Sequence, residues 1–268
     1  MNHIPAIVSM NRPVSDMLNK VPEVTLAFWV IKIMSTTVGE TGADYLAVHV
    51  GLGTAVTSGI TVSLLFAALV LQLRMRRYVP WIYWLTVVLV SVVGTQITDA
   101  LTDRLGVSLY TSTATFAVTL AATFAIWYRT ERTLSIHTIV STRRELFYWA
   151  AILFTFALGT AAGDLATEEL GLGFNVGVLA FGALIASIAG AYYLGANAVL
   201  TFWLAYILTR PLGASLGDLL SQARAYGGLG LGTVYTSIAF LTVIVVLVAA
   251  ISFEERRTQL QQGAGGTP

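Results

Sequence analysis

Long apolar stretches alternate with short polar ones over most of the chain. Eight stretches are long enough, at about 20 residues each, to cross roughly 30 Å of hydrocarbon. They lie near residues 24–46, 53–73, 80–101, 107–128, 147–166, 173–194, 198–220 and 230–252. The first, third, fifth and seventh are less uniformly apolar and carry acidic residues near their ends. The pattern predicts an all-α integral membrane protein with eight transmembrane helices.

Composition agrees with this class. Hydrophobic residues make up 56% of the 268 residues and charged residues only 11%, against about 25% in soluble proteins. The chain has no cysteine, which excludes disulfides and thiolate metal sites. The first 20 residues lack a basic segment followed by an apolar run, so we expect no cleaved signal peptide. Nothing in the sequence indicates nucleic-acid binding.

Basic residues gather on one side of the predicted spans. Eleven of the fifteen Lys and Arg residues fall there: Arg12, Lys20, Arg74, Arg76, Arg77, Arg129, Arg132, Arg143, Arg144, Arg256 and Arg257. Only Arg104 and Arg224 lie in the opposite loops. The positive-inside rule then predicts that both termini are cytoplasmic.

The chain contains four internal repeats. The segments "FWVIKIMSTTVGETGADYL", "YWLTVVLVSVVGTQITDAL", "YWAAILFTFALGTAAGDLA" and "FWLAYILTRPLGASLGDLL" align without gaps. Each has a Trp, a Gly ten residues later and an Asp five residues after that. These are Trp29, Gly39 and Asp44; Trp84, Gly94 and Asp99; Trp149, Gly159 and Asp164; and Trp203, Gly213 and Asp218.

The repeats divide the chain into two halves. Successive Trp residues are 55, 65 and 54 positions apart, so the longer middle interval holds a connecting segment. We predict a cytoplasmic segment at 1–21, a four-helix half at 22–128, a cytoplasmic linker at 129–146, a second half at 147–252 and a partly disordered cytoplasmic tail at 253–268. Because each repeat spans the membrane twice, all four enter it in the same direction, as parallel repeats.

Helical geometry gives the motif a meaning. If the Trp residues mark the cytoplasmic interface, each Gly lies about 15 Å deeper and each Asp about 22 Å from that interface. Around a common axis, the Asp residues would form a ring of carboxylates above a ring of exposed backbone at the glycines. Alternatively, the Asp residues sit in the outer interface and the glycines serve packing only.

Three further charges lie within these spans. Glu40 stands one helical turn before Asp44, on the same face. Lys32 follows Trp29 by three residues and could either snorkel to the inner interface or act as a counter-charge. Arg210 lies too deep to snorkel, so we expect it to pair with a carboxylate, most directly Glu40.

The chemistry of these residues favours hard cations. Carboxylate, hydroxyl and carbonyl oxygens suit Mn²⁺, Mg²⁺, Ca²⁺ or Na⁺. "TTVGE" is similar to a potassium-channel filter, but the other repeats do not preserve it and it lies within a span. No metalloprotease, serine-hydrolase, P-loop or dinucleotide motif is present, so we expect no enzyme.

The stretches "TTVGETGAD" and "AYILTRPLGASLGDLLS", with the repeated G-x4-D boxes, resemble a bacterial family labelled uncharacterised membrane-anchored proteins. The resemblance covers residues 22–252. It implies a bacterial inner-membrane location and no settled substrate.

We therefore expect a cation transporter in the lipid bilayer, with a divalent metal such as Mn²⁺ as the favoured substrate. Glu40, Asp44, Asp99, Asp164 and Asp218 would bind or relay the ion, and Lys32 and Arg210 would supply counter-charge. Two alternatives stay open: a proton-coupled exporter of a small organic molecule, and a non-transporting scaffold or sensor. The sequence carries no signal for substrate identity, direction of transport or oligomeric state.

Overall fold

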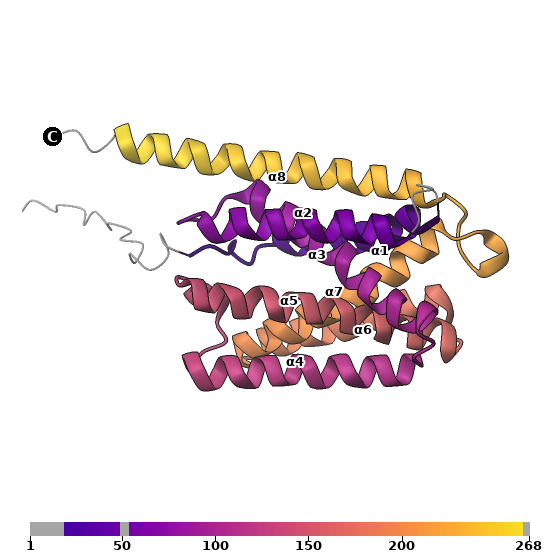
Figure 1. Cartoon of the computed structure of the whole chain (residues 1–268). Helices are drawn as coiled ribbons and strands as arrows, with labels where there is room; N and C mark the ends of the chain where they lie inside the picture. Colours follow the sequence, from indigo (N-terminus) through magenta and orange to yellow (C-terminus); the bar gives the residue numbers. More distant parts are fainter. Residues whose placement is uncertain (1–18, 49–53, 265–268) are drawn as a thin grey trace, which may run out of the picture.

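The computed structural model describes residues 19–48 and 54–264 (Figure 1). Eight long helices run back and forth along one axis. They are α1 (Leu26–Val48), α2 (Thr54–Arg74), α3 (Pro80–Asp99), α4 (Leu109–Glu131), α5 (Thr142–Asp164), α6 (Gly173–Tyr193), α7 (Ala198–Ser221) and α8 (Thr233–Ala264). Short turns follow four of them: η1 (Ala100–Arg104), η2 (Ile136–Thr138), η3 (Leu165–Glu169) and η4 (Arg224–Tyr226).

The helices match the eight predicted spans closely, except that α8 continues to Ala264. Seven of them, α2 to α8, are long and apolar enough to cross a membrane by length and composition. Helix α1, which carries Lys32 and Glu40, is not among these seven. The fold is that of an all-helical protein whose apolar helices suggest several membrane passages.

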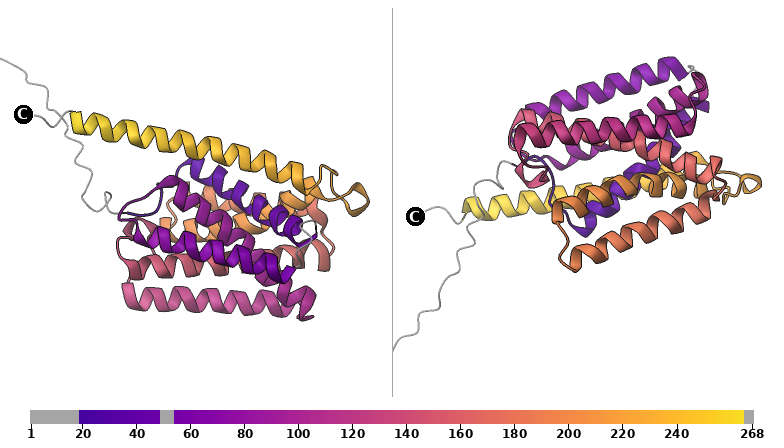
Figure 2. Two further views of the ribbon diagram at one scale, coloured as in Figure 1. Left: turned by 45° about the horizontal axis from the view of Figure 1, so that its top comes forward. Right: turned by 90° about the horizontal axis from the view of Figure 1, so that it is seen from below.

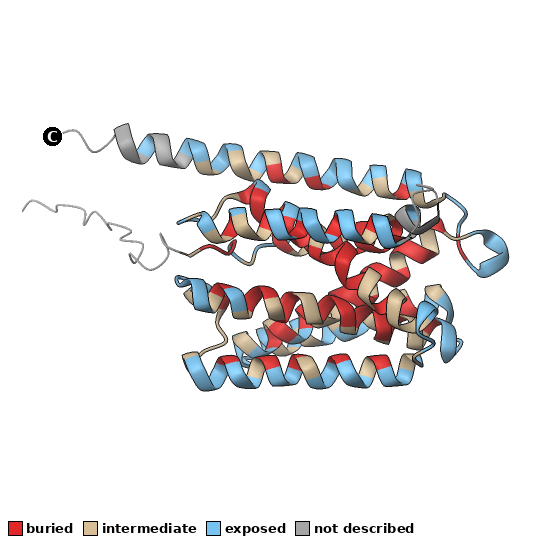
Figure 3. Ribbon diagram, viewed as in Figure 1, coloured by how far each residue is buried: buried red, intermediate tan, exposed pale blue. Residues whose placement is uncertain are grey.

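The first helices of the four repeats form an inner ring. Helix α1 packs against α3, α3 against α5, α5 against α7, and α7 against α1. Figure 3 shows that buried residues concentrate in these inner helices. More than half of the apolar stretches of α3, α5 and α7 is buried, against 28% or less in α2, α4, α6 and α8. The less apolar spans of the sequence are therefore the enclosed ones.

The second helix of each repeat covers the first helix of the next repeat. Helix α2 packs mainly on α3, α4 on α5, α6 on α7, and α8 on α1. Figure 2 shows these outer helices around the ring from two sides. Adjacent repeats are thereby interlocked, and α8 closes the circle onto the first repeat.

Glycine sets the distance between inner helices. We count positions in each repeat from its Trp, so Gly39, Gly94, Gly159 and Gly213 occupy position +10. A Cβ at each would overlap the residue at position +7 of the next repeat: Ser91, Phe156, Arg210 and Thr36 in turn. The predicted ring of exposed backbone is wrong, because the inner helices run unbroken through these glycines. Their role is close packing.

An aromatic layer closes the ring at the end where the inner helices begin. The aromatic residue before each Trp contacts the Trp of the next repeat. The ring centroids are 5.6 Å apart for Phe28–Trp84, 5.5 Å for Tyr83–Trp149, 6.2 Å for Tyr148–Trp203 and 5.7 Å for Phe202–Trp29. Trp84, Trp149 and Trp203 are buried inside the protein, so their packing serves the ring rather than a lipid interface.

The two ends of the bundle differ in charge. The end with the aromatic layer carries the arginines at and just after the ends of α2 and α4, those near the end of α8 and those that begin α5; we call it the basic end. The opposite end carries Asp103, Glu168 and Glu169 beside the repeat aspartates; we call it the acidic end. A charged side chain inside the ring therefore lies between a mainly positive end and a mainly negative end of the bundle.

Candidate functional site

Arg210 lies in the middle of the inner ring and is fully buried. Its Nη1 donates to the Thr36 carbonyl at 2.8 Å, and its Nη2 donates to Glu40 Oε2 at 2.6 Å. The same Nη2 also donates to Thr160 Oγ1 at 2.8 Å and to Thr95 Oγ1. The guanidinium on α7 therefore joins α1, α3 and α5, and the predicted ion pair with Glu40 is present.

The repeat pattern explains this meeting point. Glu40, Thr95, Thr160 and Ala214 all occupy position +11 of their repeats. Arg210 occupies position +7, one helical turn before, where the other repeats have Thr36, Ser91 and Phe156. One repeat thus supplies the cation, another the anion, and two supply hydroxyl acceptors. The four repeats are related by symmetry in their backbone, but the ion pair occurs only between the first and the fourth repeat.

Lys32 is also fully buried within the ring, so of the two alternatives for this residue the snorkelling one is wrong. Its Nζ lies 4.1 Å from the ring centroid of Phe156 and 4.3 Å from that of Tyr206. Among the described residues, this Nζ has no hydrogen-bond or ion-pair partner. The Arg210 guanidinium lies 5.7 Å from the same Phe156 ring. Two buried cations therefore share one aromatic side chain, and only Arg210 has a carboxylate.

The repeat aspartates lie between this centre and the acidic end. Asp218 is buried, and Asp99 and Asp164 are half-buried. Asp164 lies within electrostatic range of Glu40, Asp218 and Asp99. The sequence-predicted acids therefore converge on one side of the Arg210–Glu40 pair. The side chain of Asp44, the fourth repeat aspartate, lies outside the described part of the structure.

The acids whose side chains the structure describes do not enclose a metal site in this conformation. Among the described side chains, no group of three or more His, Asp or Glu residues lies close enough to hold a metal ion. Glu40 is instead paired with the positive charge of Arg210. A cation that approached Glu40 would have to compete with the guanidinium for the Oε2 atom that Arg210 contacts.

A second polar network ties the basic end together. Lys20 Nζ donates to Glu145 Oε2 at 2.6 Å and to the Leu73 carbonyl at 3.1 Å. Gln72 Nε2 donates to the other Glu145 oxygen at 3.2 Å. Tyr83 and Tyr148 hydroxyls, in the aromatic layer nearby, lie 2.5 Å apart. These bonds join the segment before α1 to α2 and α5, and join α3 to α5, at the basic end.

Sequence reasoning found the two members of the central ion pair and missed the groups around them. Thr95 and Thr160 are unremarkable as single residues, since Thr is common in membrane helices. Aligning position +11 across the repeats would have shown one acid and two hydroxyls in one layer. Phe156 and Tyr206 were missed as neighbours of Lys32 because they come from different repeats.

Comparison with known proteins agrees with the internal symmetry. Four consecutive segments match the protein family described as Repeat of Unknown Function (DUF347): residues 27–78, 82–133, 147–196 and 201–257. No curated protein matches the chain. No solved structure matches it either. The four matched segments correspond to the four repeats recognised from the Trp, Gly and Asp spacing.

Proposed function

Because the chain belongs to this family of repeats, whose function is unknown, we propose a function from the site itself: transport of a hard cation across a membrane. The observation that carries the proposal is the buried Arg210–Glu40 pair on the inner ring, with the repeat aspartates next to it. Buried charges inside a membrane are costly and usually belong to a transport or relay pathway.

The pair supports an exchange mechanism. A cation arriving from the acidic end would be attracted by the half-buried Asp99 and Asp164 and then by Asp218. It would compete with the Arg210 guanidinium for Glu40. Release of Arg210 would leave the Glu40 carboxylate to the ion, and carboxylate oxygens are hard ligands of the kind that Mg²⁺, Ca²⁺ and Mn²⁺ prefer.

The aromatic layer supports alternating access. Phe28, Tyr83, Tyr148 and Tyr206 are all fully buried between the central pair and the basic end. On the acidic side of the pair, Asp99 and Asp164 are only half-buried. A transport cycle would require these rings to separate, so that the ion can leave on the other side.

We further propose the orientation that the arginines predict. The basic end would face the cytoplasm of a bacterial inner membrane, because positive residues stay on the cytoplasmic side. The acidic end would then face outward. The favoured ion is a divalent metal such as Mn²⁺, with Mg²⁺, Ca²⁺ and Na⁺ as the other members of the test panel.

Flux measurements in vesicles test the proposal. The full chain is reconstituted, and uptake of Mn²⁺, Mg²⁺, Ca²⁺ and Na⁺ is followed. Glu40→Gln should abolish flux, and most of Asp44→Asn, Asp99→Asn, Asp164→Asn and Asp218→Asn should reduce it strongly. Asp103→Asn and Glu169→Gln are matched controls, because both acids are exposed at the same end. Flux should weaken as pH falls, since protons compete for carboxylates that bind the cation.

Two outcomes would reject the proposal. If the wild type shows no flux of any of the four ions, a scaffold or sensor would be favoured. Wild-type flux in Glu40→Gln and in all four Asp→Asn variants would place the pathway elsewhere.

A further inference from the structure

The inner ring carries its charged side chains in successive layers, one helical turn apart. Lys32 occupies position +3 of its repeat, Arg210 position +7, Glu40 position +11, and the repeat aspartates position +15. Four residues correspond to about 6 Å along a helix, so Lys32 lies on the basic-end side of Arg210 and about 12 Å from Glu40 along α1. The guanidinium therefore stands between the amine of Lys32 and these carboxylates.

Few other titratable groups surround Lys32. Between position −1 and position +15, the inner helices α1, α3, α5 and α7 carry three described titratable residues besides Lys32. These are Tyr206, Arg210 and Glu40. Residues 54–73 of α2 and 236–253 of α8, the other helices that pack on α1, contain none. The charge of Lys32 is therefore set mainly by Arg210 and, beyond it, by Glu40.

Aromatic faces alone hold the amine of Lys32 in the described part of the structure. Its Nζ lies 4.1 Å from the ring centroid of Phe156 and 4.3 Å from that of Tyr206, and no described residue accepts a hydrogen bond from it. Ring faces attract an ammonium group, but no carboxylate holds its proton. A lysine amine can exchange its proton, whereas an arginine guanidinium stays charged in proteins. Of the two buried cations, Lys32 is therefore the one that can change its charge.

Phe156 links the charge of Lys32 to the position of Arg210. The guanidinium lies 5.7 Å from the centroid of the same ring. A cation that arrives from the acidic end and takes Glu40 would drive the guanidinium toward the basic end, and so toward Phe156 and Lys32. Two positive charges beside one ring repel each other. Because the arginine keeps its charge, the lysine proton is the one that leaves.

We propose that Lys32 is a proton-binding site, and that its proton is exchanged for the transported cation. The inference rests on the proposed cation transport and names the coupling ion. With a proton on Nζ, the ammonium repels the guanidinium toward Glu40, and the Arg210–Glu40 pair excludes the cation. When the cation binds at Glu40, Nζ releases one H⁺ and keeps its electron pair as a neutral amine. One proton leaves for each cation that binds.

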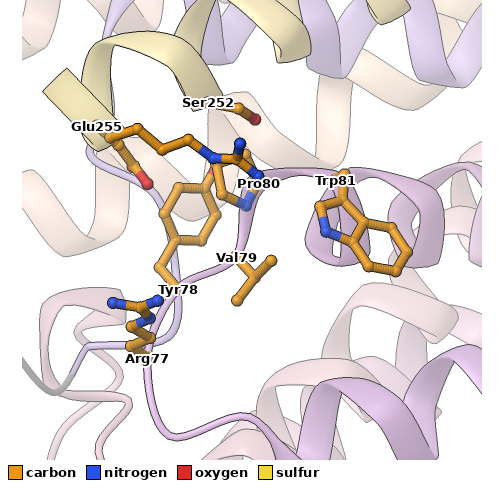
Figure 4. A pocket seen from close by; sticks show the side chains of 8 residues that line it. Arg77, Tyr78, Val79, Pro80, Trp81, Ser252 and Glu255 are labelled. Carbon is orange, nitrogen blue, oxygen red and sulfur yellow. The ribbon is translucent and has the colours of Figure 1, made fainter.

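Tyrosines connect Lys32 with the basic end. Tyr206, whose ring lies under the amine, is within electrostatic range of Tyr83 and Tyr148. The hydroxyls of Tyr83 and Tyr148 lie 2.5 Å apart. Tyr83 packs on Tyr78, with ring centroids 5.7 Å apart. Tyr78 in turn lines a pocket of about 120 Å³ at the start of α3 (Figure 4). The proton would leave along this line of phenol groups.

Exchange of Mn²⁺ for protons tests the assignment in vesicles that contain the full chain, with the membrane potential clamped at zero. If one proton leaves for each ion that enters, an outward proton gradient of one pH unit should concentrate Mn²⁺ inside about tenfold. Lys32→Met cannot carry the proton, so this accumulation should disappear while exchange of Mn²⁺ for Mn²⁺ continues. Lys32→Arg keeps a permanent charge beside Arg210 and should abolish both.

Lys20→Arg is the matched control, because it makes the same change at the other of the two lysines in the chain and keeps a cation beside Glu145. It should behave like the wild type. If the wild type does not move Mn²⁺, the ion of the panel that it does move takes its place. Accumulation by Lys32→Met, or transport by the wild type without accumulation, would overturn the proton site and leave the proposed transport intact. Failure of the wild type to transport any ion of the panel would reject transport and this inference with it.

Thermal unfolding in detergent tests the antagonism between Lys32 and Arg210 without any flux. Lys32→Met should raise the unfolding temperature of the wild type, because it removes a charge beside the guanidinium. In the Arg210→Met background the same change should lower the unfolding temperature, since Lys32 is then the remaining buried cation of the described ring and Glu40 has no other. An equal rise in both backgrounds would show that the two charges do not interact, and the proposal would be wrong.

Discussion

Gly213 of the fourth repeat packs so closely against Thr36 of the first that a Cβ at Gly213 would overlap the Thr36 side chain. The same contact, between position +10 of one repeat and position +7 of the next, occurs at the three other junctions of the inner ring. The contact between the last and first repeats is therefore of the same kind as those between consecutive repeats. Closure of the ring places Arg210, one turn before Gly213, beside α1.

Alanine at the ring glycines should loosen the inner helices. Gly39→Ala, Gly94→Ala, Gly159→Ala and Gly213→Ala should each lower stability by about 1–3 kcal/mol, because the added methyl group overlaps the next helix. Thermal unfolding in detergent measures the effect. Gly182→Ala is the matched control, since no atom lies within 4 Å of a Cβ added there, and alanine in an open helical position stabilises by about 0.5–1 kcal/mol. Equal effects at Gly182 and at the four ring positions would contradict the packing role.

Removing the carboxylate of Glu40 should leave Arg210 charged and buried. Glu40→Gln is expected to lower stability by about 3–5 kcal/mol, the usual effect of deleting one partner of a buried pair. The double variant Glu40→Gln, Arg210→Met should recover most of this loss, because no uncompensated charge then remains. Unfolding curves of the two single variants and the double variant give the coupling energy. Additive losses would show that the two residues do not act as a pair.

Removing the amine of Lys32 should raise the stability of the protein, whereas removing the carboxylate of Glu40 lowers it. Lys32→Met keeps the length of the side chain and removes an amine that has no polar partner among the described residues. Stability should rise by about 1 kcal/mol or more, because the desolvation cost of the amine exceeds a cation–π contribution of about 0.5–2 kcal/mol. Arg210→Met, measured in the same unfolding assay, should be destabilising. A loss of stability in Lys32→Met would reveal an anionic partner for this amine.

Weakening the contacts of Arg210 should make Glu40 easier for a cation to reach. Thr95→Val and Thr160→Val each remove one acceptor of the Arg210 guanidinium, at a cost of about 1 kcal/mol of stability. The apparent affinity for the transported cation should then rise by up to about fivefold, seen as a lower KM in vesicles. Thr119→Val, at a half-buried position of α4 outside the inner ring, should change neither quantity. A raised KM would mean that these hydroxyls bind the ion rather than restrain the arginine.

The sequence predicted the helices and the four repeats well, because hydropathy and spacing depend on single segments. The bond between Arg210 and Glu40 was also predictable, since a buried arginine needs a carboxylate and few are available. The neighbours of each helix were harder to foresee. Short loops suggest that consecutive helices pack together, yet α1 hardly contacts α2, the helix that follows it, and packs instead against α8 at the other end of the chain. The surroundings of Lys32 were not predictable for the same reason, since they come from Phe156 and Tyr206, which belong to other repeats.

The pairing of α8 with α1 has a consequence for synthesis in the cell. Helix α1, the first of the described helices to be synthesised, is the last to receive its cover, and it carries Lys32 and Glu40. If the chain enters a membrane as proposed, one side of this polar helix stays uncovered until residues 233–264 have been translated. A chain truncated before α8 would therefore leave α1 exposed on that side for as long as the chain exists.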